Sequence, residues 1–364
     1  MNICIIGDGL TSLSLAKNLI NKKINVHVYQ KKIINNLSIS RTIGISKNNM
    51  NFFKKEILKL PKKITWEIKK IEIYSEKLKK IKILNFENDN KNLFYMVKNN
   101  ELYKSLNERL LKNKLFKKTT IKNEKQYVKL LEKNNYDLLI NCDQNNLITK
   151  KYFIKIAKDY KNLAYTTIIE HEKLENKSAI QVFTKLGPIA YLPISNTKTS
   201  VVCSIDIKNK IYKENEIIEL ISKHNPKFKI RKILKLSSFK LKSSNLRNYY
   251  HKNILAFGDM LHRIHPLAGQ GFNMTIRDIK ELSEIIQYKI DLGLQLDSSI
   301  LEEFEKKTKN KNFIFSTGID FTYEFFNYDK KRKGKNLIKI LKYFGSNKSF
   351  MNSVIKFADR GINT

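Results

Sequence analysis

An acidic residue and a glycine-rich turn lie between a short apolar run and a helical pattern in the last third of the chain. The apolar run covers 253–257, the acid is Asp259, the turn is Gly269-Gln270-Gly271, and the helical pattern covers 275–290. A turn that opens a helix exposes backbone N–H groups with no partner inside the helix, and such groups bind anions. The segment 258–273 is therefore predicted to bind a negatively charged group.

The first thirty residues contain a second unit of the same kind. Apolar runs at 2–6 and 25–29 flank a helical pattern at 10–20, which is the layout of a β-α-β dinucleotide-binding unit. The turn between the first run and the helix reads Gly7-x-Gly9-x-x-Ser12. Gly7 allows the tight turn, and Gly9 lets a pyrophosphate approach the backbone.

Two positions of this unit depart from the usual dinucleotide pattern. Ser12 replaces the third glycine, although it is small enough for the helix to pack closely on the strand. Gln30 replaces the acid that usually holds the ribose, and its amide can bond a ribose without contributing charge. Two nucleotide-binding turns so far apart in one chain predict a single large bound dinucleotide.

The composition is that of a globular protein with one elaborate domain or two. The chain has 364 residues and 41% hydrophobic content. It has no apolar run of about 18 residues, and its first residues form a strand pattern without a basic leader, so neither a membrane span nor a secretory signal is expected. Cys4, Cys142 and Cys203 form no Cys-x-x-Cys pair, which predicts reduced thiols in a cytoplasmic protein.

The net charge of +36 is compatible with binding to nucleic acid or to an anionic membrane. Only eight of the 70 basic residues are Arg, and the lysines are spread from Lys17 to Lys356. Base stacking needs aromatic side chains interleaved with a basic stripe, whereas most aromatics here lie in apolar runs. We attribute the charge to a general drift in composition and expect no nucleic-acid partner.

The order of the expected elements indicates a discontinuous dinucleotide-binding domain made of residues 1–63, 98–160 and 246–300. Its patterns include a continuous apolar run at 136–142, typical of a strand in a parallel sheet. Short, partly alternating runs in 64–97 and 161–245 predict an inserted, mostly antiparallel sheet that binds the substrate. Helical periodicity predicts a helical region at 301–364.

Several motifs together resemble the FAD-dependent class A aromatic monooxygenases, and most closely the ubiquinone-biosynthesis hydroxylases. The string from His262 to Asn273, followed by Arg277-Asp278, resembles their second FAD-binding motif. Segments 41–46, 99–102 and 183–193 are similar to the family's arginine segment, flavin-side helix and substrate-sheet signature, and the tail also has the family's helical pattern. The resemblance covers essentially the whole chain.

The resemblance implies a fold like that of p-hydroxybenzoate hydroxylase. Such a fold is α/β, with a Rossmann-like FAD-binding domain, an inserted, mostly antiparallel β-sheet substrate domain and a C-terminal helical tail. The resemblance also implies hydroxylation of the aromatic ring of a polyprenylated phenol in ubiquinone biosynthesis. In the family, NAD(P)H is a transient reductant, and oxygen reacts with reduced flavin to give a flavin hydroperoxide that transfers hydroxyl.

The family's roles correspond to particular residues of this chain. Asp259 is expected at the ribitol or pyrophosphate of FAD, Arg41 at the pyrophosphate, and Pro266 beside the flavin ring. The N–H groups around Gly269, Gln270, Gly271 and Asn273 are expected at the flavin pyrimidine edge, where a helix N-terminus stabilises the negative charge of reduced flavin. His262 and His265 suggest acid–base chemistry, with His265 as a proton relay to the phenol, or else histidines that shape the turn.

One family motif is altered. Asp143 retains the acid of a Gly-x-Asp-Gly turn, but Gln144 replaces the glycine after it, and Lys150 or Lys151 takes the place of an arginine. In the family this turn serves both the FAD pyrophosphate and the approach of NAD(P)H. Two alternatives therefore stay open: hydroxylation of another aromatic compound, and a catalytically weakened subunit of a membrane-associated biosynthetic complex.

A basic run at 329–335 precedes an apolar helical pattern that ends at Phe344. Such a basic amphipathic helix could touch an anionic bilayer that carries a polyprenylated substrate, as a peripheral contact on the inner face of the membrane. The alternative is a tail helix that packs on the protein with its lysines outward. The sequence contains no pattern typical of a metal site.

Overall fold

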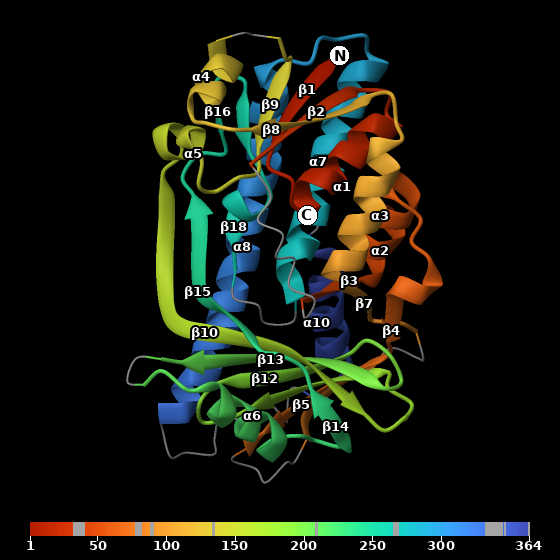
Figure 1. Ribbon diagram of the computed structural model, residues 1–364, viewed down its shortest axis with the longest axis vertical. Helices are drawn as coiled ribbons and strands as arrows, with labels where there is room; N and C mark the ends of the chain where they lie inside the picture. The colour runs from red at the N-terminus through yellow and green to blue at the C-terminus, as the bar shows by residue number, and fades with distance from the viewer. Residues whose placement is uncertain are drawn as a thin grey trace.

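Five parallel strands and one short antiparallel strand form the sheet that carries the glycine turns (Figure 1, top). The computed structural model describes residues 1–31, 41–76, 82–87, 91–132, 135–207, 210–264, 269–331, 345 and 347–362. The sheet order is β16 (Tyr250–His251), β17 (Ile254–Ala256), β9 (Leu138–Asn141), β1 (Asn2–Ile6), β2 (Asn25–Lys31) and β8 (Phe116–Ile121). The four apolar runs expected to form buried strands are thus confirmed as neighbours in one sheet.

Helices cover this sheet and complete its core. α1 (Leu10–Asn21) packs against α3 (Asn99–Leu111) and α7 (Gln270–Asp291). Leu13, Leu106 and Leu282 are fully buried there, because each helix places its apolar side chains on one face at helical spacing. Two short helices, α4 (Lys125–Glu132) and α5 (Leu147–Tyr152), precede and follow β9 in the chain.

A small antiparallel sheet contains β3 (Thr42–Ser46), β7 (Phe94–Lys98) and β4 (Thr65–Ile68). We expected all of 64–97 to join the inserted sheet, but β4 and β7 pair with β3 instead. The reason is that β7 is buried on both faces: Tyr95 and Val97 belong to the core of the parallel sheet, while Met96 packs against Leu192 of the larger sheet. α2 (Lys47–Phe52) and a π-helical turn, Phe53–Ile57, follow β3.

The inserted sheet has nine strands and is mostly antiparallel (Figure 1, bottom). Its order is β18 (His262–Arg263), β15 (Ser237–Leu246), β10 (Lys155–His171), β13 (Lys198–Asp206), β12 (Pro188–Pro193), β11 (Ser178–Phe183), β5 (Lys70–Ser75) and β6 (Lys82–Glu87), with β14 (Ile230–Ile233) paired to β10. Among the strand pairs that the structure describes in this sheet, only β11 and β5 run parallel. One face packs on Ile217 and Ile221 of α6 (Glu214–Lys223).

β10 and β15 connect the two halves of the molecule, as Figure 1 shows at the left. Their pairing shifts register between Asp159 and Asn162, and Lys161 between them has a positive φ of 53°. A β-bulge bends the strands that carry it. The bent pair therefore runs from the level of the parallel sheet into the nine-stranded sheet below it.

The helical tail is confirmed over the described part of the chain. α8 (Ser298–Lys331) buries Phe304 in the core of the parallel sheet and Phe315 against the nine-stranded sheet. α10 (Lys348–Arg360) follows it. Most of the basic amphipathic segment expected at 329–344 lies outside the described residues. Among the helices that the structure describes, none combines the length and the apolar character needed to cross a membrane.

Candidate functional site

Three turns meet at the carboxyl edge of the parallel sheet, after the adjacent strands β1, β9 and β17. Gly7 has a φ of +107°, and a Cβ atom there would lie 3.5 Å from the backbone N of Asp143 and 3.3 Å from Ser12 Oγ. Gly258 has a φ of +68°, and a Cβ atom there would lie 2.4 Å from Thr11 Cγ2. Glycine is therefore required at both positions for the three turns to pack together.

The N-terminus of α1 faces open space. Gly9 is its N-cap, no side chain caps the helix there, and nothing lies within 4 Å of a Cβ atom built on Gly9. The first turn of α1 contains no acidic residue. These free N–H groups, together with the positive end of the helix dipole, suit the pyrophosphate of a dinucleotide.

Gln30 lies at the end of β2, the position from which a contact with a ribose is expected. Its Nε2 donates to Thr120 Oγ1 of β8 at 3.3 Å, whereas its Oε1 is buried and has no partner among the described residues. A buried acceptor without a donor is unfavourable, and a ribose hydroxyl would supply that donor. The residues at this end of the site therefore fit the adenosine half of FAD.

The altered turn at Asp143 is tied to its neighbours. Gln144 Nε2 donates to the backbone oxygen of Asp259 at 2.8 Å, so the residue that replaces a glycine links two of the three turns. Lys155 Nζ donates to the Gln144 backbone oxygen at 3.0 Å, and Lys31 Nζ lies 3.5 Å from the Asp143 carboxylate. Asp259 itself is exposed, in a short 3-10 helix, Gly258–Met260.

The cations beside these turns are different from the ones proposed from the sequence. Lys150 and Lys151 are exposed, and Lys151 Nζ lies over the ring of Tyr152. The lysines that contact the Asp143-Gln144 turn are Lys31 and Lys155 instead. Sequence reasoning missed them because lysine is frequent along the whole chain, and only the strand pairing shows which lysines reach the turns.

A third lysine, Lys118, forms an ion pair with Asp8 of the first glycine turn. Lys118 Nζ of β8 lies 3.8 Å from the Asp8 carboxylate, and Tyr103 Oη donates to the same group at 3.2 Å. Burial lowers the pKa of Lys118, and the charge of Asp8 opposes that change. Asp8 would repel a pyrophosphate, so this pairing reduces the repulsion at the mouth of the site.

The glycine turn that is expected at the flavin forms the start of α7 and lies against β3. Gly269 is the N-cap, in the left-handed region at a φ of 64°, and a Cβ atom there would lie 3.5 Å from the Gly44 backbone N. Asn273 is 2% exposed, and its side chain donates to the Gly44 oxygen at 2.9 Å and accepts from the Ser46 N–H at 2.8 Å. The Asn273 side chain thus fixes the turn to β3, while an added Cβ atom at Gly271 would meet open space.

Arg41 lies between the two halves of the molecule. Its guanidinium is 5.4 Å from the centroid of the Phe239 ring on β15, and its backbone oxygen accepts from the Asn99 N–H at 3.0 Å. Its expected role at the pyrophosphate stays a prediction. His265 and Pro266, the other two residues expected beside the flavin, lie outside the described residues.

His262 is a buried structural residue. Its Nε2 lies 2.5 Å from Asp278 Oδ2 on α7, and Asn312 of α8 donates to the other oxygen of that carboxylate at 2.9 Å. The His262 side chain is 0% exposed, so it has no open path to a ligand. The alternative that His262 shapes the turn is the one that this geometry favours.

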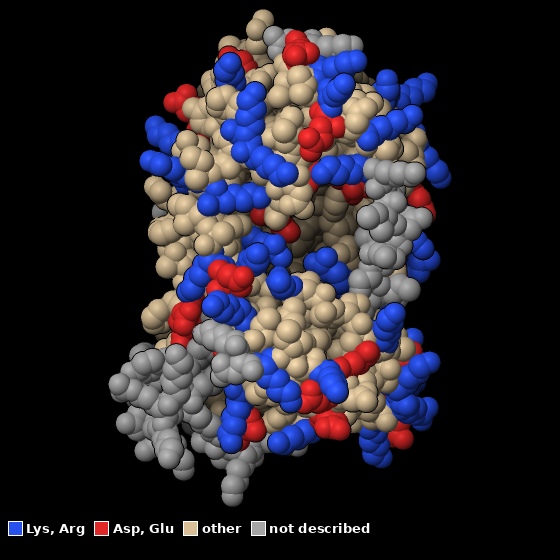
Figure 2. Space-filling view, turned by 60° about the vertical axis from the view of Figure 1, so that its left-hand side comes forward, with Lys and Arg blue, Asp and Glu red and all other residues tan. Residues whose placement is uncertain are grey.

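The two faces of the nine-stranded sheet differ in character. The face on α6 carries large apolar side chains such as Tyr191 and Ile205, whereas the opposite face carries Ala164 and Ser200. Thr42 of β3 donates to Ser200 Oγ at 2.9 Å, which places that second face toward the parallel-sheet half. Figure 2 shows a hollow between the two halves, with Lys and Arg side chains around its mouth.

An apolar wall completes this region. Phe239 and Leu241 of β15 pack with Met274 of α7 and with Ile264, the last described residue before the flavin-side turn. Small side chains on the sheet and an apolar wall beside the turn suit a hydrophobic aromatic substrate.

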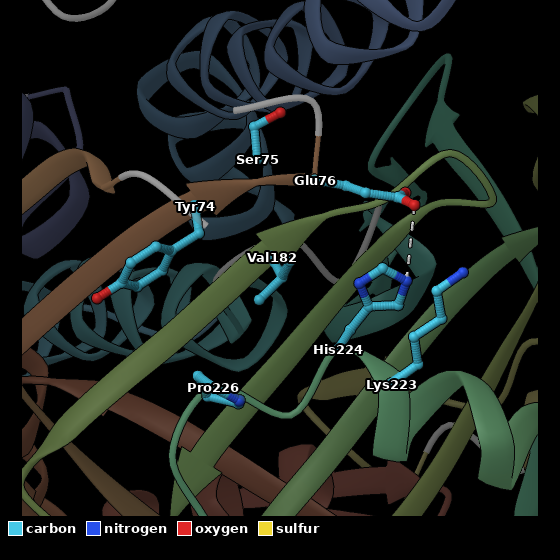
Figure 3. Close-up of a pocket in the computed structure, with 7 residues that line it drawn as sticks. All are labelled: Tyr74, Ser75, Glu76, Val182, Lys223, His224 and Pro226. Atoms are coloured by element: carbon cyan, nitrogen blue, oxygen red, sulfur yellow. Dashed lines mark ion pairs between the residues drawn. The ribbon is translucent and has the colours of Figure 1, made fainter. Parts of the chain in front are cut away.

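A separate cavity of about 310 Å³ lies elsewhere in the nine-stranded sheet (Figure 3). It is lined by side chains from β5, β11 and the end of α6, among them Tyr74, Glu76 and His224. His224 Nε2 is 3.9 Å from Glu76 Oε1. The cavity is on the α6 side of the sheet, so it does not belong to the site between the two halves.

Comparison with known proteins supports the predicted resemblance. Residues 162–300 match the family described as FAD binding domain. The ubiquinone biosynthesis monooxygenase COQ6 of Danio rerio is 27% identical over 226 residues, 50% of this chain and 47% of that protein. The predicted family resemblance is confirmed. The 3-demethoxyubiquinol 3-hydroxylase of Escherichia coli is 28% identical over 161 residues, 43% of this chain and 41% of that protein.

The chain thus spans about half the length of the curated relatives it matches, or less. The match to the FAD-binding family contains Asp259 and the Gly269 turn, but not Gly7 or Asp143. This division agrees with the sequence motifs, because the turns at Gly7 and Asp143 are the ones that depart from the usual patterns.

Solved structures confirm the fold over the whole chain. A p-nitrophenol 4-monooxygenase from Pseudomonas putida superposes with a TM-score of 0.78 at 12% identity, covering 100% of this chain and 98% of that one. Klebsiella pneumoniae HpxO, complexed with FAD and uric acid, gives a TM-score of 0.74 at 11% identity, with 99% and 97% covered. The predicted α/β fold with an inserted sheet is therefore correct.

Proposed function

We propose that this chain is an FAD-dependent monooxygenase that uses NAD(P)H and oxygen to hydroxylate the aromatic ring of a polyprenylated phenol in ubiquinone biosynthesis. The observation that carries the proposal is the meeting of the turns at Gly7, Asp143 and Gly258 on one sheet edge, with the N-terminus of α7 held beside them. The names of the relatives support the choice of pathway and substrate.

In this proposal the residues at the sheet edge bind FAD. The N–H groups after Gly9 bind the pyrophosphate, the free oxygen of Gln30 accepts from the ribose, and exposed Asp259 bonds the ribitol region. Bound FAD would supply the redox chemistry, with NAD(P)H as the reductant and oxygen as the co-substrate. The N-terminus of α7 stabilises the negative charge that reduction places on the pyrimidine edge.

The substrate is proposed to bind between the two halves. In this proposal the ring lies beside the sheet face that carries small side chains such as Ser200, and the apolar cluster of Phe239, Leu241 and Met274 shields it from water. A long prenyl chain needs such an apolar path. We include a peripheral contact with the inner face of an anionic membrane, or with a biosynthetic complex there, which the net charge of +36 supports.

A second candidate function is a catalytically weakened subunit of such a complex. The observation that favours it is Gln144, whose side chain crosses to the backbone of Asp259 in the turn where the family receives the reductant. This candidate predicts FAD binding without turnover. Hydroxylation of a different aromatic compound is the remaining alternative, and product analysis separates it from the first proposal.

The test begins with the absorbance spectrum of the purified full chain after addition of FAD. We expect a bound flavin, oxidation of NAD(P)H in air that a short-chain prenylphenol stimulates, and a product heavier by one oxygen atom. A soluble hydroxybenzoate is the comparison substrate. Protein that binds no FAD contradicts the proposal, and bound FAD without substrate-dependent oxidation favours the weakened subunit.

A further inference from the structure

A half-buried arginine lies directly behind the flavin-side turn. Arg277 is in the second turn of α7, and its Nη2 donates to Gln270 Oε1 at 3.3 Å. Its Nε donates to the backbone oxygen of Asn273 at 3.2 Å. The guanidinium therefore bonds both ends of the segment from Gln270 to Asn273, the first turn of the helix.

The tail of the chain builds the pocket that holds this guanidinium. The Arg277 guanidinium carbon lies 4.3 Å from the centroid of the Phe315 ring on α8, and Phe315 stacks on Phe357 of α10 at 4.9 Å. A Cβ atom at Gly361 would lie 2.1 Å from Arg277 Nη1. Gly361, with a φ of +75°, is thus the residue that lets the end of α10 approach the arginine.

α10 is anchored at both ends. Ser46 Oγ donates to the Asp359 backbone oxygen at 2.9 Å, and the Asn48 N–H donates to the Asp359 carboxylate at 2.8 Å. At its other end, Met351 packs with Ile83 and Leu84 at the β6 edge of the nine-stranded sheet. The helix therefore extends from the nine-stranded sheet to β3, the strand that also contacts the flavin-side turn.

The half-buried guanidinium keeps its charge. Burial lowers the pKa of Arg277 to about 10, and the neighbouring carboxylates of Asp278 and Asp359 oppose that change. Arg277 is therefore protonated at neutral pH. Asp278 is already engaged by His262 and Asn312, so it does not form the main partner of the arginine. A positive charge thus adds to the positive end of the α7 dipole.

We propose that Arg277 is a positioning residue for the flavin, and that α10 completes the flavin site by holding Arg277 in place. Arg277 orients Gln270 and stiffens the first turn of α7, and its charge favours the reduced, negatively charged flavin. This inference rests on the proposed FAD function and adds two parts of the chain to it, the second turn of α7 and the C-terminal helix.

The test compares full-length Arg277→Met and Arg277→Lys with the wild type. We expect Arg277→Met to weaken FAD binding about tenfold. We also expect a tenfold shift of the two-electron reduction equilibrium toward oxidised flavin, which is a fall of about 30 mV in the midpoint potential. Arg277→Lys keeps the charge, so it should recover most of the potential while FAD binding stays weak, a division that simple destabilisation would not produce.

Arg231→Met is the matched control, because Arg231 is 72% exposed on β14, and it should match the wild type. If Arg277→Met does not fold, Gly361→Ala tests the same contact from the side of α10 and should lower the potential in the same direction. A wild type that binds no FAD contradicts the proposed function itself. A wild type that binds FAD, with an unchanged potential in the variant that folds, overturns the role of Arg277.

Discussion

At the end of β2, the Gln30 side chain places an amide oxygen where dinucleotide-binding proteins usually have a carboxylate. Substitutions of Gln30 therefore test FAD binding directly. Gln30 Oε1 is buried without a partner, so a ribose hydroxyl would satisfy it. A charge-assisted hydrogen bond is roughly twice as strong as a neutral one. We therefore expect Gln30→Glu to tighten FAD binding roughly tenfold and Gln30→Leu to weaken it by a similar factor.

Fluorescence titration of the apoprotein with FAD measures both changes. Gln295→Leu is the control, because Gln295 is an exposed residue in the loop after α7. Equal affinities for the wild type, Gln30→Glu and Gln30→Leu would show that the ribose does not reach β2.

Spacing identifies the residues of the site only in part. The glycines at 7, 9, 258 and 269 could be predicted because each occupies a turn between apolar runs. The N–H groups of the turn at 269–273 are expected at the flavin, whereas the role of the Asn273 side chain in bonding the Gly44 backbone of β3 was not predictable from spacing. Lys31, Lys118 and Lys155 depend on strand pairing, which a lysine-rich sequence does not reveal.

Among the elements, the buried strands were predictable and the edge strand β8 was not. β8 is half polar, Phe116-Lys-Lys-Thr-Thr-Ile121, because an edge strand has one open side. It matters nevertheless, since it supplies Lys118 and Thr120 to the site. The division of residues 64–97 between two sheets could not be predicted either. Because β7 is apolar on both faces, its residue pattern does not indicate which strands pair with it.

The junction of β2 and β8 gives a prediction for the pH dependence of stability. His27 Nδ1 lies 2.6 Å from Tyr136 Oη, and Nε2 lies 2.7 Å from Thr119 Oγ1 of β8. Burial, and then the charge of Lys117, lowers the pKa of His27 to about 4. The pKa in the unfolded chain is about 6.5. Since the folded pKa is the lower one, the stability that neutral His27 contributes is complete above pH 6.5 and is lost as pH falls toward 4.

Urea unfolding at pH 7 and at pH 5 checks this prediction. The wild type should lose more of its unfolding free energy between these conditions than His27→Gln, which cannot take up the proton. Equal losses would assign the acid sensitivity to other groups.

Four described elements join the parallel-sheet half of the molecule to the nine-stranded-sheet half: the bent strands β10 and β15, and the helices α8 and α10. α8 buries Phe304 in one half and Phe315 in the other, and α10 contacts β6 at one end and β3 at the other. The C-terminal region is therefore part of the frame that sets the distance between the expected flavin and substrate. Substitutions in α10 should affect the site although they lie near the end of the chain.

The net charge of +36 is a property of the whole molecule, and it predicts binding to anionic membranes. The lysines, which are spread along the whole chain, attract anionic lipid, and the exposed side chains Phe313, Ile314 and Phe321 of α8 add apolar contact area. The Debye length falls from about 10 Å at 0.1 M salt to about 3 Å at 1 M. We therefore expect the protein to sediment with vesicles of phosphatidylcholine and phosphatidylserine at low salt, and to be largely released at high salt.

Vesicles of phosphatidylcholine alone separate charge from apolar contact, because they carry no net charge. If α8 faces the bilayer, Phe321→Ser should reduce the part of the binding that survives high salt, while Val128→Ser, an exposed apolar residue of α4, should leave it unchanged. Equal binding to charged and uncharged vesicles would contradict an electrostatic contact. Since a prenylated phenol resides in the bilayer, a protein held there by charge would meet the proposed substrate at the membrane surface.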